Sequence, residues 1–186
     1  MKRLLLAMAI ICAVACSTPK SEIATDVAII PQPLSLVQHN NSFTITPATA
    51  LVCEAEELAP LVPYLQGYIA LQSVVKEAPA NNYLAILLDS SLAEEEYHLS
   101  VSNEAVKIVG GGYGGVFNGV QTLFQLLPSE VYTKQMPLPA EVQGCEVKDK
   151  PKFAYRGFML DVARTFVTKE NVLRYIDYIA YHKINK

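Results

Sequence analysis

The chain has 186 residues, with 15 basic and 18 acidic side chains and a formal net charge of −3. This mildly acidic balance, without a cluster of basic residues, gives no indication of a nucleic-acid partner. Apolar residues make up 51% of the chain, which is high for a soluble protein, and part of that excess comes from the first residues.

The N-terminus has the pattern of an export signal. Lys2 and Arg3 precede an apolar run over residues 4–14. A run of this length is too short to span a bilayer, which needs about 20 apolar residues. It ends at Ala13-Val14-Ala15-Cys16, and a polar stretch follows.

This ending resembles a bacterial lipoprotein signal, although the usual Leu three positions before the cysteine is absent. The resemblance implies that Cys16 is lipidated and becomes the mature N-terminus. We therefore expect a signal peptide over 1–16, a linker over 17–27, and an exported protein anchored by lipid to a bacterial membrane, facing the periplasm or the cell surface. The alternative is an ordinary secretory peptide that contains Cys16.

Two further cysteines remain in the mature chain. In an exported protein, Cys53 and Cys145 could form a disulfide or stay as buried free thiols, and their spacing does not decide between the two. The cysteines and histidines do not have the spacing of a zinc site, so we expect no metal and no cofactor.

Residues 28–150 read as an α+β domain with a mixed sheet and helices on one face. Apolar residues at helical spacing fill 56–72, although Pro60 and Pro63 require a helix to begin near them or to kink. Short alternating or continuous apolar runs predict strands at 42–46, 83–88, 97–101 and 105–109. The last two of these strands should form a hairpin.

A glycine-rich turn and a helix follow this hairpin. Residues 110–115 lack the Gly-Lys-Ser/Thr of a phosphate-binding loop, so we interpret them as a strand-to-helix turn that needs positive φ values. The helix has one apolar face, formed by Val116, Val120, Leu123, Phe124 and Leu127, and Pro128 ends it. Two other segments are expected on the surface. We interpret the acidic run Glu94–Glu96 as a solvated turn rather than a metal site. Residues 136–139, which are rich in proline, should form an exposed connection.

The last segment reads as a strand, a short loop and a helix. Apolar residues between 153 and 162 predict a strand buried on both faces, as in a parallel sheet. Asp161 and Arg164 fall at its end, where a parallel barrel has its active-site face. Thr168 is a helix N-cap, and Glu170 lies in the first turn. This is the first unit of a (β/α)8 TIM barrel, truncated at residue 186.

The same segment resembles the start of the catalytic barrel of family 20 glycoside hydrolases, the β-N-acetylhexosaminidases. The family motif is matched, with Thr165 where the family usually has His, by Phe153, Arg156, Gly157, Asp161, Arg164, Phe166, His182, Lys183 and Asn185. Upstream, residues 29–33, 96–99 and 110–127 resemble the α/β domain that precedes this barrel.

The resemblance implies a retaining hydrolase that removes terminal non-reducing N-acetylhexosamine residues from glycans by substrate assistance. It places the catalytic Asp-Glu pair on a later strand, so we expect no catalytic residue in this 186-residue chain and no activity from the chain alone. Arg164 would bind the hydroxyls of the terminal sugar. The alternative for Arg164 is a rim ion pair with Asp161, and both can hold at once. Arg156 reads as a structural ion-pair partner.

A second function of a different class is a non-catalytic surface lipoprotein that uses the α+β domain for binding or assembly. A downstream Asp-Glu pair on a barrel strand would favour the hydrolase.

Overall fold

The computed structural model describes residues 27–134 and 136–186. Its centre is a seven-stranded mixed sheet of order β1-β7-β5-β6-β4-β2-β3. The strands are β1 Ser35–Ile45, β2 Ala50–Cys53, β3 Val74–Val75, β4 Tyr83–Leu88, β5 Tyr97–Val101, β6 Ala105–Gly110 and β7 Ala140–Asp149. The helices are α2 Leu61–Tyr68, α3 Tyr113–Leu126 and α4 Lys169–Tyr181, with short 3-10 turns η1 Glu56–Leu58 and η2 Ser129–Thr133.

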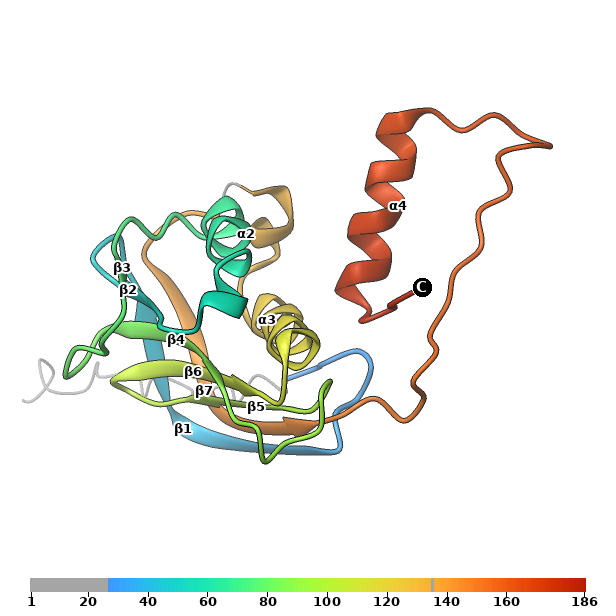
Figure 1. Cartoon of the computed structure of the whole chain (residues 1–186). Helices are drawn as coiled ribbons and strands as arrows, with labels where there is room; N and C mark the ends of the chain where they lie inside the picture. Colours follow the sequence, from blue (N-terminus) through green and yellow to red (C-terminus); the bar gives the residue numbers. More distant parts are fainter. Residues whose placement is uncertain (1–26, 135) are drawn as a thin grey trace, which may run out of the picture.

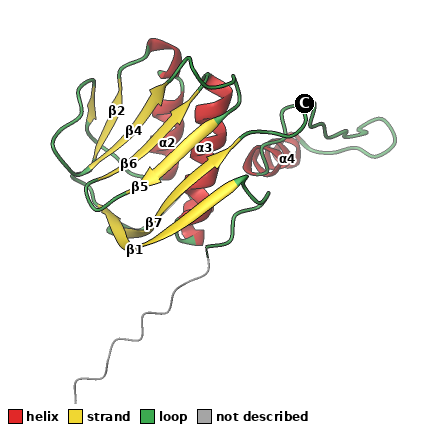
Figure 2. Cartoon of the chain, turned by 90° about the horizontal axis from the view of Figure 1, so that it is seen from below, coloured by secondary structure: helices red, strands yellow, loops and turns green. Residues whose placement is uncertain are grey.

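Helices α2 and α3 cover one face of this sheet (Figure 1). Figure 2 shows the strands in front of these two helices, with α4 beside the sheet. The prediction of a mixed sheet with helices on one face is confirmed. Strands β3, β2, β4 and β6 run parallel to one another, whereas the pairs β6–β5, β5–β7 and β7–β1 are antiparallel.

The main core lies between the sheet and its helices. On α3, Val116, Val120, Leu123 and Phe124 are fully buried, as the helical spacing predicts. The hairpin of β5 and β6 is also confirmed, and Ser102 closes it, because its hydroxyl accepts hydrogen bonds from the backbone N–H groups of Glu104 and Ala105.

Of the two alternatives for residues 56–72, the helix that begins near the prolines is the one that forms. Here η1 is followed by α2, whose N-cap is Pro60. Pro63 lies in the first turn of α2, where the missing N–H has no intrahelical partner to lose. The two prolines thus set where this helix begins.

The glycine-rich turn is confirmed as structural, but the predicted reason is wrong. No glycine of the described residues has a positive φ. The glycines are needed because the backbone approaches its neighbours closely: a Cβ on Gly111 would overlap the carbonyl oxygen of Ala93, and one on Gly115 would overlap that of Glu96. Close packing of the β6–α3 turn on residues 93–96 therefore explains the run.

Gly111→Ala should accordingly destabilise the domain by about 1–3 kcal/mol, since the overlap is with rigid backbone. Gly67→Ala is the matched control, because Gly67 lies in α2 with nothing within 4 Å of its added Cβ. Alanine there should stabilise by roughly 0.5–1 kcal/mol. Urea unfolding monitored by circular dichroism measures both. Equal midpoints for the two variants would contradict this account of the turn.

The predicted strand over 153–162 is wrong for this chain. The segment forms no strand, and Phe153, Tyr155, Phe158 and Met159 are exposed rather than buried. A strand requires a neighbour for its backbone hydrogen bonds. Within residues 27–134 and 136–186, only one short pairing is available, between 156–158 and 185–186.

The helix after this segment is confirmed. α4 begins at Lys169, and the Thr168 hydroxyl accepts a hydrogen bond from the Asn171 N–H at 3.4 Å. In the part of the chain that the structure describes, no helix is both long and apolar enough to cross a membrane. The predicted signal peptide and Cys16 lie outside the described residues.

Both cysteines of the domain are free. Cys53 lies in β2 and Cys145 in β7, and three strands separate β2 from β7 in the sheet. The alternative of a disulfide is therefore wrong for this structure. Burial raises the pKa of the Cys145 thiol to about 11, so it is an inert core residue rather than a nucleophile.

The connection 136–139 is only partly on the surface. Met136 is 6% exposed and packs into the core, whereas Pro137 and Pro139 are exposed. It leads into β7, which lies between β1 and β5 and ends at Asp149. The segment that carries the candidate site thus begins just after the end of β7.

Candidate functional site

Arg164 lies in the turn between the extended segment 153–162 and helix α4. Its side chain is 91% exposed, and its Nε lies 3.7 Å from Oδ2 of Asp161. The other oxygen of Asp161 accepts hydrogen bonds from the backbone N–H groups of Ala163 and Arg164, at 2.9 and 3.2 Å. Asp161 therefore shapes the turn that presents Arg164, and it leaves the guanidinium accessible.

The contact with Asp161 is that of the predicted rim ion pair. An exposed pair at 3.7 Å is a weak interaction, worth about 0–1 kcal/mol. The planar guanidinium thus keeps most of its donors available. Such a group is suited to hold two neighbouring hydroxyls of a sugar.

Arg156 lies at the opposite end of the same segment and is held rigidly. Its guanidinium donates to both carboxylate oxygens of Glu95, at 2.6 and 3.0 Å. Its Nε donates to the carbonyl oxygen of Lys183 at 2.7 Å. The pair lowers the pKa of Glu95 below its ordinary value, chiefly through the hydrogen bonds from Arg156. The interpretation of Arg156 as a structural ion-pair partner is confirmed.

Lys183 is a buried charged residue whose environment the sequence did not reveal. Its side chain is 6% exposed, and its ammonium donates to the hydroxyl of Tyr97 at 2.8 Å and to Asp149 at 3.3 Å. The Tyr97 hydroxyl also lies 2.6 Å from that of Thr122. Burial lowers the pKa of Lys183, and the carboxylate of Asp149 opposes that effect. The only sequence signal was its place in the motif.

Lys183 borders a cavity of about 350 Å³ between the α/β domain and the C-terminal segment. The walls include Tyr97, Asn118, Asp149, Arg156 and His182. Arg164 is not among the residues that line this cavity. The structure therefore separates the Arg164 turn from the Lys183 network.

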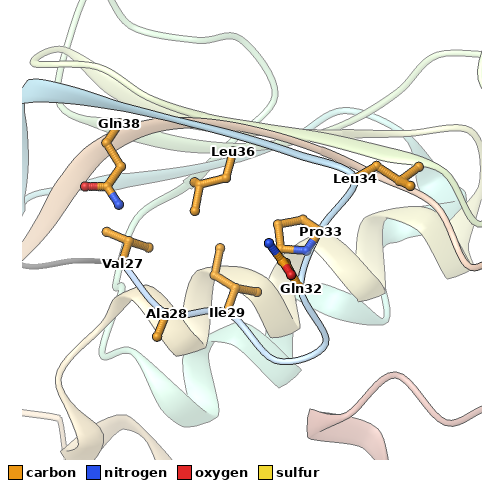
Figure 3. A pocket seen from close by; sticks show the side chains of 8 residues that line it. All are labelled: Val27, Ala28, Ile29, Gln32, Pro33, Leu34, Leu36 and Gln38. Carbon is orange, nitrogen blue, oxygen red and sulfur yellow. The ribbon is translucent and has the colours of Figure 1, made fainter.

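A second cavity, of about 560 Å³, lies between the start of the described chain and β1. Figure 3 shows its lining, in which Leu36 points toward Ile29 and Gln38 points toward Val27. The lining holds no ionisable side chain, so it lacks a group for acid-base or nucleophilic chemistry.

Two glutamates of the acidic run 94–96 form hydrogen bonds that stabilise the structure. Glu95 binds Arg156, and Glu96 accepts a hydrogen bond from the Ala93 N–H. Among the residues that the structure describes, no three His, Cys, Asp or Glu side chains gather as a metal site.

Two family models match parts of the chain. Residues 26–150 match the family described as "Glycosyl hydrolase family 20, domain 2", and residues 153–186 match "Glycosyl hydrolase family 20, catalytic domain". The chain is 37% identical to a beta-hexosaminidase of Porphyromonas gingivalis, over 100% of this chain and 26% of that protein. It is 32% identical to a beta-N-acetylhexosaminidase of Cellulomonas fimi, over 86% and 33%.

The fold is similar to solved structures as well. The family 20 beta-N-acetylhexosaminidase of Streptomyces coelicolor A3(2) superposes with a TM-score of 0.76 at 32% identity, over 85% of this chain and 33% of that chain. The chain thus spans 26% to 33% of these relatives' length. Since the family match covers residues 26–150, more than half of the sequence, the chain belongs to glycosyl hydrolase family 20.

Proposed function

We propose that this chain is the N-terminal part of a β-N-acetylhexosaminidase that removes terminal non-reducing N-acetylhexosamine residues by a substrate-assisted, retaining mechanism. The names of the similar proteins support the activity. The observation that carries the proposal is the geometry of residues 153–186, which has the features of the first βα unit of a (β/α)8 barrel.

The first such feature is a short parallel pairing. The Lys186 N–H donates to the carbonyl oxygen of Arg156 at 3.2 Å, and the Phe158 N–H donates to that of Lys186 at 2.9 Å. In a parallel ladder, a residue on one strand forms its two backbone hydrogen bonds with the residues just before and just after its partner on the other strand. Here Lys186 pairs with Gly157, and α4 is the crossover between them. This strand, helix and strand order supports a parallel barrel.

The second feature is an uncovered apolar stripe on α4. Leu173 and Ile176 are 51% and 50% exposed. A different face of α4 contacts the α/β domain, through Tyr181 beside Tyr68 and Tyr132 and through Asp177 beside Lys134. Barrel helices bury such a stripe against the strands. The exposed stripe therefore supports further barrel strands as its cover.

In this proposal, Arg164 binds the terminal sugar and Asp161 holds the turn that presents it. The guanidinium provides paired donors for two neighbouring hydroxyls and so fixes the sugar ring in one orientation. The acetamido group of the substrate is the nucleophile, and a general acid must protonate the leaving group. We assign that acid to a later barrel strand.

The test compares this chain with a chain extended to the whole barrel, using a chromogenic N-acetyl-β-glucosaminide. The extended chain should release the chromophore with retention of anomeric configuration, and the 186-residue chain should be inactive. Release of the first product as the α-anomer, or an extended chain that folds without activity, would contradict the proposal. The second outcome would favour the non-catalytic surface lipoprotein.

We also propose that the protein is exported and anchored to a bacterial membrane through Cys16. The support is the basic start of the chain, the short apolar run and the cysteine at its end. Mass spectrometry of the mature protein from producing cells should find a diacylglyceryl group on an N-terminal Cys16, and Cys16→Ser should release the protein from the membrane fraction. An unmodified N-terminus at another residue would refute the anchor.

A further inference from the structure

The beginnings of the two paired segments lie together on the α/β domain. Arg156 starts the first segment, and Lys183 to Lys186 lead into the second. Each segment is attached to the domain by one ion pair. The first segment is attached through Arg156 and Glu95, and the second through Lys183 and Asp149. The acceptors come from the loop before β5 and from the end of β7.

Glu95 contacts both segments at once. Besides the two hydrogen bonds from Arg156, it accepts one from the side-chain amide of Asn185 at 3.3 Å. That amide also donates to the carbonyl oxygen of Ala154 at 3.0 Å, and its oxygen accepts from the Arg156 N–H at 3.1 Å. Asn185 thus ties the two segments to each other and to one carboxylate.

Lys183 attaches the second segment to the α/β domain. Its backbone is in the left-handed region, with φ of 60°, as is common for the residue after a helix C-cap. The Lys183 and Ile184 N–H groups close the end of α4 on the carbonyl oxygens of Ala180 and Ile179, at 2.9 and 3.0 Å. The side chain is buried against Tyr97 and Asp149 and so attaches this turn to the α/β domain. The chain turns at this residue from the end of α4 to the short pairing with 156–158.

We propose that the α/β domain is an intramolecular template for the barrel: Glu95, Tyr97 and Asp149 bind Arg156, Lys183 and Asn185 and thereby set the pairing register of the first two barrel strands. The proposal rests on the barrel assigned above. A slip of one residue would turn every side chain of the first strand to its other face. Arg156 and Glu95 therefore fix where the first strand enters this pairing.

The test measures amide hydrogen exchange in the 186-residue chain, residue by residue, by NMR. Glu95→Gln removes the charge but keeps the shape. The matched control is Glu141→Gln, which changes an exposed glutamate on β7. Asn185→Ala is the second variant, because Asn185 is exposed and outside the sheet. The informative probes are the N–H groups of Phe158 and Lys186, and the reference probes are those of Leu84 and Ile108 in the sheet.

In Glu95→Gln and in Asn185→Ala, exchange at Phe158 and Lys186 should become roughly ten to a hundred times faster, as the loss of charge-assisted hydrogen bonds implies. Exchange at Leu84 and Ile108 should stay unchanged in both, and Glu141→Gln should change neither pair. Unchanged exchange at Phe158 and Lys186 would overturn the template, as would equal acceleration at all four amides in Asn185→Ala, because that would reveal a general loss of stability.

This readout does not depend on hydrolysis. If the exchange pattern holds but an extended chain is inactive, the template stands and the proposed function fails. If the extended chain is active while exchange is unaffected, the function stands and the template fails.

Discussion

Replacing Arg164 with alanine, in a chain extended to the whole barrel, should lower kcat/KM for an N-acetylhexosaminide by about a hundredfold or more. A hydrogen bond from a charged group contributes on the order of 1.5–3 kcal/mol, and the proposed clamp makes at least two. The melting temperature should change little, because Arg164 is 91% exposed and has only a weak contact with Asp161.

Two further variants separate binding from structure. Arg164→Lys should recover little activity, because an ammonium cannot reproduce the planar, forked set of donors. Arg156→Ala should lower the melting temperature more than it lowers turnover of the folded fraction, since it removes the bidentate contact with Glu95. Near-normal kcat/KM for Arg164→Ala, or a loss that follows unfolding alone, would make Arg164 a structural residue.

Local patterns predicted much of the α/β domain because they report burial directly. The alternation in β5 and β6, the apolar run of β4 and the stripe on α3 each correspond to a buried face. Strand β1 was predicted only in its second half. Its first half is an exposed edge with a register shift between Gln38 and Ser42, so polar residues there hide the strand.

Strand β7 was missed for a similar reason. It pairs with β1 across the same register shift, and Gly144 packs against Asn41 at that point, so the alternation is broken in the middle of the strand. The opposite error occurred at 153–162. The local sequence there suits a buried strand, but a ladder depends on neighbours from elsewhere in the chain.

Only the part of the site that depends on local sequence was predicted, because contacts between distant parts of the chain leave no local pattern. The placement of Arg164 beyond an extended segment followed from local sequence, and so did the capping of α4 by Thr168. The partners of Arg156 and Lys183 did not, because Glu95, Tyr97 and Asp149 come from distant parts of the chain. A lysine in a motif gives no sign of burial until its acceptors are known.

Lys183→Met should be among the most destabilising single changes in the 186-residue chain. Methionine fills a similar volume, but it leaves the carboxylate of Asp149, 14% exposed, without its cation. Breaking a buried pair on one side costs about 3–5 kcal/mol, because the remaining charge stays desolvated. The hydroxyl of Tyr97, 3.2 Å from Asp149, keeps one hydrogen bond to it and holds the loss toward the lower end of that range.

Urea unfolding of three variants measures the effect. Lys134→Met is the control for charge removal alone: Lys134 is 51% exposed and lies 3.9 Å from Asp177, so its loss should cost no more than about 1 kcal/mol. Lys183→Met with Asp149→Asn should regain part of the stability that Lys183→Met loses, because the unpaired charge is then gone. If Lys183→Met costs no more than Lys134→Met, or if the double variant is as unstable as the sum of its parts, then Lys183 and Asp149 do not stabilise the junction as a pair. A large loss with partial recovery would place a buried ion pair where the α/β domain meets the segment that carries Arg164.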